Sequence, residues 1–88
     1  MMINITELKK KIIYRASYRG TKEMDKLLGS FTQKYINLLQ EEDLQLLCDL
    51  LDYEDEDLYK FNQGQDTTKK FTLNKVTELF KNYIYKNE

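Results

Sequence analysis

The sequence predicts an all-α fold, a compact five-helix bundle that forms a single domain over residues 1–88. Apolar side chains recur at the three- and four-residue spacing of an α-helix in five successive segments. No segment alternates apolar and polar side chains as a half-buried strand does. The 88 residues include no proline and no low-complexity stretch, so nothing indicates a linker or a second domain.

The first two predicted helices meet at Gly20. Asn4 followed by Glu7 forms a capping-box pattern, so we expect the first helix to begin just after Asn4. Gly20 lets the backbone leave the helix, which should end near Arg19. Thr21 is the expected N-cap of the second helix. Its apolar stripe extends through seven positions, Met24, Leu27, Leu28, Phe31, Tyr35, Leu38 and Leu39.

Three shorter helices are predicted in the second half of the chain. The third is expected from Leu44, Leu47, Cys48 and Leu51, which lie at helical spacing. Asp55 is the predicted N-cap of a fourth helix that ends at Gly64. After a polar loop over residues 62–70, Thr72 is the predicted N-cap of the fifth. The apolar stripe of that last helix consists of Val76, Leu79, Phe80, Tyr83 and Ile84.

The composition argues against catalysis. The chain has no histidine and one cysteine, so the common nucleophile and base pairs and the usual zinc ligands are missing. Cys48 falls on an apolar stripe and is expected to be a small core side chain. The acids between residues 52 and 57 suit the first turn of a helix better than a metal or catalytic site. We therefore predict that the chain is not an enzyme and has no catalytic or metal-binding residues.

Location and charge point to a cytoplasmic protein that does not bind nucleic acid. No apolar run approaches the about 18–20 residues needed to cross a bilayer, and the start lacks the pattern of a signal peptide. A single cysteine cannot form an internal disulfide, which fits a reducing compartment. Residues 41–57, in the middle of the chain, contain many acids and no Lys or Arg, so this segment would repel the phosphates of a nucleic acid.

The first predicted helix carries a basic ridge. Lys11, Arg15 and Arg19 are spaced by four residues and share one side of the helix, while Tyr14 and Tyr18 fall off its apolar stripe and should be exposed. Arg and Tyr often carry the binding energy of protein interfaces. A docking surface and a simple solvated face both explain this pattern, and composition does not separate them.

Two motifs favour the docking surface. The segment Arg19-Gly20-Thr21-Lys22-Glu23-Met24-Asp25 resembles the RGxxE motif, often extended to RGxxExD, of the SdhE-like succinate dehydrogenase assembly factor family. Residues 50–58, LLDYEDEDL, resemble the LL-x(3)-D-x-D-L stretch of the same family, and an aromatic follows at Phe61. Family members often have proline at the position of Glu56, tryptophan near Phe61 and a basic residue at Tyr18. These departures affect the docking face more than the fold.

The resemblance implies a chaperone-like factor that binds the flavoprotein subunit of succinate dehydrogenase and promotes covalent attachment of FAD. The flavoprotein of fumarate reductase is a second implied partner, and FAD belongs to the partner and is not stably bound here. By the same resemblance, Arg19 and Glu23 contact the partner, Gly20 allows close backbone approach and Asp25 supports the turn. The predicted partner-binding set is completed by Arg15 and Tyr18.

Two other functions remain open from the sequence. One is a generic protein-interaction or antitoxin-like protein that binds a different partner through the same ridge. The other is a small helix-turn-helix DNA binder, which the acidic third and fourth helices disfavour. We expect the free chain to be a monomer that does not insert directly into a membrane.

Overall fold

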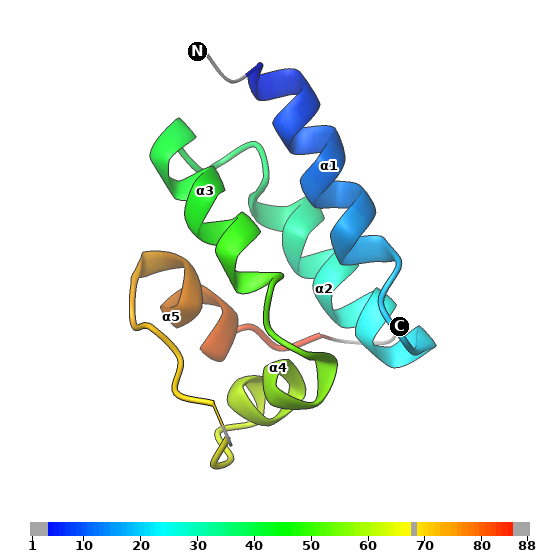
Figure 1. The fold of residues 1–88 in the computed structure, drawn as a ribbon, viewed down its shortest axis with the longest axis vertical. Coiled ribbons are helices and arrows are strands. Elements are labelled where there is room, and N and C mark those ends of the chain that lie inside the picture. Colours follow the sequence, from blue (N-terminus) through cyan, green and yellow to red (C-terminus); the bar gives the residue numbers. More distant parts are fainter. Residues whose placement is uncertain (1–3, 68, 86–88) are drawn as a thin grey trace.

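The computed structural model describes residues 4–67 and 69–85, and within them the chain forms five helices and no strand. The helices are α1 (Ile5–Ser17), α2 (Lys22–Tyr35), α3 (Glu41–Leu50), α4 (Asp55–Asn62) and α5 (Lys75–Lys81) (Figure 1). The radius of gyration is 12.5 Å, close to the about 12 Å expected for a compact chain of this size. The predicted all-α five-helix fold is confirmed.

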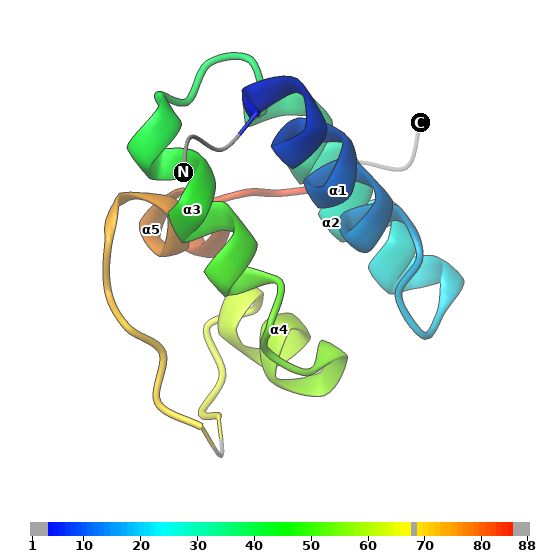
Figure 2. The same cartoon turned by 45° about the horizontal axis from the view of Figure 1, so that its top comes forward.

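Helices α1 and α2 form an antiparallel hairpin whose facing stripes are buried (Figures 1 and 2). Asn4 caps α1 as predicted, because its side chain accepts hydrogen bonds from the N–H groups of Thr6 and Glu7. Helix α1 then ends at Ser17, slightly before the predicted boundary. Ile3 and Leu8 have the sequence spacing of a hydrophobic staple, but Ile3 lies outside the described residues. Residues 86–88, where the sequence predicts a frayed tail, also lie outside them.

Helix α3 packs against α1 and α5, and α4 packs against α5. The apolar faces of the helices meet in one core. Its largest fully buried apolar side chains are Phe31, Phe80, Ile12, Leu28, Leu44, Leu47, Leu50, Leu51, Leu58 and Val76. Cys48 is also buried, as expected of a small core side chain.

Two predicted stripes continue beyond the ends of their helices, and the predictions were wrong for Leu38 and Ile84, whereas Leu39 and Tyr83 pack against the core. Helix α2 ends at Tyr35, after which the backbone turns so that Ile36 stays buried while Leu38 is 73% exposed. Helix α5 ends at Lys81, and Ile84 is 76% exposed. Helical spacing predicts a buried face only while the helix itself continues.

Two predicted N-caps were also wrong. Glu54 occupies the N-cap position of α4 without a capping hydrogen bond, and Asp55 is the first residue of the helix. Asn74, not Thr72, caps α5, because its side chain accepts from the N–H of Thr77 while the Thr77 hydroxyl accepts from the N–H of Asn74. This reciprocal capping box satisfies two backbone donors, which a threonine two residues earlier could not do.

A stack of aromatic rings holds the long segment between α4 and α5 against the body. The Phe71 ring lies between those of Tyr53 and Phe61, with centroid distances of 3.9 and 4.1 Å and interplanar angles of 12° and 9°. The Asn62 side-chain amide donates to the carbonyl oxygens of Phe80 and Tyr83 at 2.8 and 2.9 Å. These bonds tie α4 to the end of α5 and to the segment that follows it.

Candidate functional site

The turn between α1 and α2 spans residues 18–21 and carries the first part of the Arg-Gly-x-x-Glu sequence. Helix α1 ends where Tyr18 leaves the helical region, with φ −123° and ψ 71°. Thr21 starts α2 by accepting a hydrogen bond from the Met24 N–H at 3.2 Å, which confirms it as the N-cap. The turn therefore stands at one end of the helix hairpin (Figure 1).

The Arg19 side chain lies against the connection between α3 and α4, with only 11% of its surface exposed. Its Nε donates to Oδ1 of Asp55 at 2.7 Å, while its two Nη atoms donate to the carbonyl oxygens of Leu51 and Tyr53, both at 2.9 Å. A rigid, planar guanidinium that donates in three directions fixes all three acceptors at once. We call this group of four residues the Arg19 clamp.

Gly20 completes the clamp through its backbone. Its N–H donates to Oδ2 of Asp55 at 2.8 Å, so both oxygens of this carboxylate are engaged by the turn. A Cβ atom at position 20 would lie 3.0 Å from the same Oδ2, which is tighter than ordinary packing. Asp25, in the first turn of α2, accepts a hydrogen bond from the Arg19 N–H. A side chain at position 20 therefore fits only if the Asp55 carboxylate shifts by a few tenths of an ångström.

Arg15 makes a second, more exposed link one helical turn earlier. One of its Nη atoms contacts Oδ1 of Asp52 at 2.6 Å, and the other donates to the Cys48 carbonyl oxygen at 3.3 Å. The hydrogen bond with Asp52 raises the pKa of the Arg15 guanidinium, which stays charged at any physiological pH. Two arginines of the predicted ridge thus face acids of the α3–α4 connection and of the first turn of α4, and of the three ridge residues only Lys11 is classed as exposed.

The outer surface of the turn is formed by different side chains. Tyr14 and Tyr18 are 65% and 69% exposed, as predicted, and their ring centroids lie 4.7 Å apart. Glu23 is exposed on the first turn of α2, and among the described residues it forms no ion pair. The motif therefore has an inward half, Arg19 and Gly20, and an outward half that includes Glu23.

The sequence that forms this turn and clamp matches a known protein family. Residues 10–84 match the model of the Sdh5 family, described as flavinator of succinate dehydrogenase. The chain belongs to the Sdh5 family. The match includes the α1–α2 turn and the whole Arg19 clamp, together with most of α1 and all of α2 to α5. No curated protein and no solved structure matches the chain significantly.

In this Sdh5-family chain, sequence reasoning missed the role of Asp55. Sequence reasoning assigned Asp55 to capping, whereas its carboxylate binds Arg19 and Gly20 more than thirty positions upstream. The only sequence signal for this contact is that the two family motifs occur together. Local rules cannot pair a particular acid in the run from 52 to 57 with a particular arginine, because several acids there have similar spacing.

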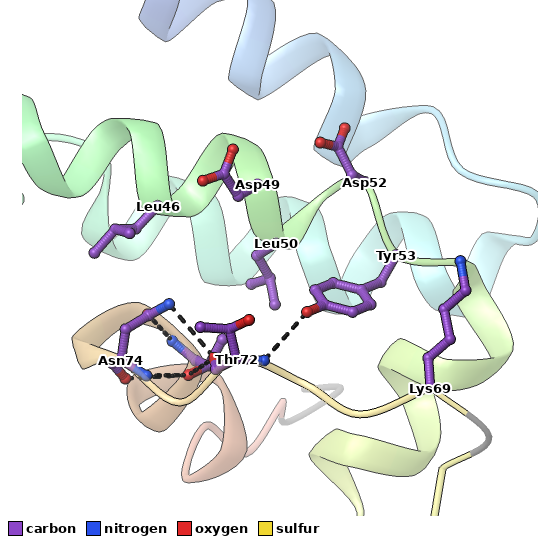
Figure 3. A pocket seen from close by; sticks show the side chains of 9 residues that line it. Leu46, Asp49, Leu50, Asp52, Tyr53, Lys69, Thr72 and Asn74 are labelled. Atoms are coloured by element: carbon purple, nitrogen blue, oxygen red, sulfur yellow. Dashed lines mark hydrogen bonds between the residues drawn. The ribbon is translucent and has the colours of Figure 1, made fainter.

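A hollow of about 330 Å³ lies on the other side of the α3–α4 connection (Figure 3). The Tyr53 hydroxyl accepts a hydrogen bond from the Thr72 N–H at 3.2 Å on one wall, and Asp49 and Asp52 stand on the α1 side. Tyr53 thus links the hollow to the Arg19 clamp, since its carbonyl oxygen is held by Arg19.

No metal or membrane site is found in the described part of the chain. Across residues 4–67 and 69–85, no three acidic or cysteine side chains are grouped so that they could hold a metal ion. Over the same residues, no helix has the length and apolar character that crossing a membrane requires.

Proposed function

We propose that this Sdh5-family chain binds the flavoprotein subunit of succinate dehydrogenase and promotes covalent attachment of FAD to it. Membership of a family described as flavinator of succinate dehydrogenase is the observation that carries the proposal. The sequence contains no histidine, and its single cysteine is a buried residue of α3, so the proposal gives the chain a binding role and no covalent step of its own. It acts as an assembly factor, and the bond to flavin forms within the partner.

The proposed mechanism is selection of a reactive conformation. A protein that binds one conformation of the flavoprotein more tightly than another increases the population of that conformation. If the favoured conformation holds flavin and its acceptor side chain in contact, the reaction becomes effectively unimolecular. A rigid docking surface suits this task, because little binding energy is then lost in ordering the surface itself.

The Arg19 clamp supplies that rigidity. Arg19, Gly20 and Asp55 tie the turn to the α3–α4 connection, and Asp25 ties it to α2. In the proposal these groups shape the turn, and the partner reaches the Arg19 and Gly20 backbone at its outer edge.

The exposed side chains around the turn make the side-chain contacts. Glu23 offers a carboxylate that is not used by the described residues, and Tyr18 with Tyr14 offers a large aromatic surface. Aromatic groups of this kind often dominate interface energies. Arg15 stands beside them, and its exposed edge joins the proposed contact surface.

The remaining features of the proposal concern partner and place. FAD stays with the flavoprotein, and the chain holds no cofactor stably. The flavoprotein of fumarate reductase is proposed as a second partner. We further propose that the free chain is a monomer and works in the cytoplasm.

The proposal is tested by measuring covalent flavin on the flavoprotein subunit through in-gel fluorescence. Cells that lack this chain should lose the signal, and wild type should restore it. Glu23→Ala should fail to restore it. Glu42→Ala is the matched control, because Glu42 is the second residue of α3, as Glu23 is of α2, and is also exposed. Unchanged fluorescence after deletion would contradict the proposed function.

A further inference from the structure

A large hollow lies next to Glu23. It has a volume of about 550 Å³ and is formed by the first turns of α2, the end of α4 and residues 81–85. The segment after α5 runs from α5 toward α2 (Figure 1), and Tyr83, Ile84 and Tyr85 of this segment line the hollow. Ligand-binding sites usually have volumes of about 300–1,000 Å³. We call this feature the α2–α4 groove.

Three tyrosines line the α2–α4 groove, and one of them, Tyr83, is held in place by hydrogen bonds. The Tyr83 hydroxyl contacts Oγ of Ser30 at 2.7 Å, and the Tyr83 carbonyl oxygen accepts from the Asn62 amide at 2.9 Å. Tyr59 is 43% exposed and Ile84 is 76% exposed, so apolar surface remains open to a ligand. Exposed apolar surface in a hollow between secondary-structure elements is typical of a binding site.

The rim of the groove is basic, although the whole chain has a net charge of −1. Lys22, Lys26 and Lys81 line it against a single carboxylate, Glu23. Within the part of the chain that the structure describes, none of these lysines forms an ion pair. Their ammonium groups are therefore available, and they favour a ligand of opposite charge.

We propose that the α2–α4 groove binds an extended acidic segment of the partner flavoprotein. An apolar side chain of that segment packs between Tyr59 and Tyr83, and its carboxylates lie against Lys22, Lys26 and Lys81. Aromatic walls and a cationic rim match such a peptide in both shape and charge. This inference rests on the proposed function and adds a second contact. Glu23 borders both the groove and the α1–α2 turn, so the two form one continuous surface.

Charge reversal tests the inference. Lys26→Glu/Lys81→Glu changes the groove without touching the α1–α2 turn, and Lys69→Glu/Lys70→Glu makes the same charge change at exposed positions outside the groove. Affinity for the purified flavoprotein subunit is measured by titration calorimetry, and circular dichroism checks the fold of each variant. We expect the groove variant to lose affinity at least about tenfold, or 1.4 kcal/mol, and the control to keep it.

Equal affinity of the groove variant and wild type would overturn the inference that the α2–α4 groove binds the flavoprotein, while leaving the proposed function intact. Failure of wild type to bind the flavoprotein would overturn both. A photo-crosslinking benzoyl-phenylalanine placed at position 59 identifies the occupant by mass spectrometry. Crosslinks to an acidic segment of the flavoprotein support the inference. Crosslinks to a neutral or basic segment, or to a second copy of this chain, would overturn it.

Discussion

Replacing Arg19 by alanine should destabilise this chain far more than replacing Arg15, although both arginines form ion pairs. Arg19→Ala removes a guanidinium that is 11% exposed and leaves Oδ1 of Asp55 and two carbonyl oxygens without the donor that Arg19 supplies. Loss of one partner of a buried ion pair costs about 3–5 kcal/mol. Asp55 is 27% exposed and keeps its hydrogen bond from the Gly20 N–H, so hydration of its carboxylate offsets part of this loss in stability. We therefore expect a loss of about 2–4 kcal/mol.

Arg15→Ala is the matched control, because its ion pair with Asp52 has side-chain exposures of 29% and 67%. Exposed pairs of this kind contribute at most about 1 kcal/mol. Urea denaturation followed by circular dichroism gives the free energy of unfolding of each variant. A whole domain of this size is stable by only about 5–10 kcal/mol, so the predicted difference is large. Equal losses for the two variants would refute the structural role of the clamp.

Two further predictions concern single side chains. Gly20→Ala should destabilise by about 1 kcal/mol, because its Cβ would press on the Asp55 carboxylate that Arg19 holds in place; unchanged stability in urea denaturation would show that Asp55 can move aside. Thr32→Val should stabilise by about 1 kcal/mol, because the Thr32 hydroxyl is fully buried and has no hydrogen-bond partner among the described residues. A lower melting temperature for Thr32→Val would contradict the statement that the Thr32 hydroxyl has no hydrogen-bond partner within residues 4–67 and 69–85.

Much of the fold followed from local sequence rules. Asn4 and Thr21 cap their helices as predicted, because a side-chain oxygen at the N-cap needs only neighbouring N–H groups. The rules failed where two residues competed for one role. Asn74 caps α5 in place of Thr72, because the Thr77 hydroxyl also accepts a hydrogen bond from the Asn74 N–H. Asp55 does not cap α4, because its carboxylate binds the Arg19 side chain instead.

The candidate site was predicted in position but not in orientation. The motif placed Arg19, Gly20 and Glu23 at the junction of the first two helices, and the structure has them there. Helical spacing alone gave Arg19 an outward direction. Its actual direction depends on the Leu51 and Tyr53 carbonyl oxygens, which no sequence pattern marks. Hydrogen bonds between a side chain and backbone oxygens far away in the sequence can be identified only in the folded structure.

The most direct test of the central claim is the rate of covalent flavin formation with purified components. The flavoprotein subunit, freed of FAD, is incubated with excess FAD in the presence and absence of this chain, and acid-stable flavin is measured over time. We expect the chain to accelerate the reaction, Glu42→Ala to match wild type, and Glu23→Ala to fall close to the rate without added chain. Equal rates with and without the wild-type chain would contradict its role in flavin attachment.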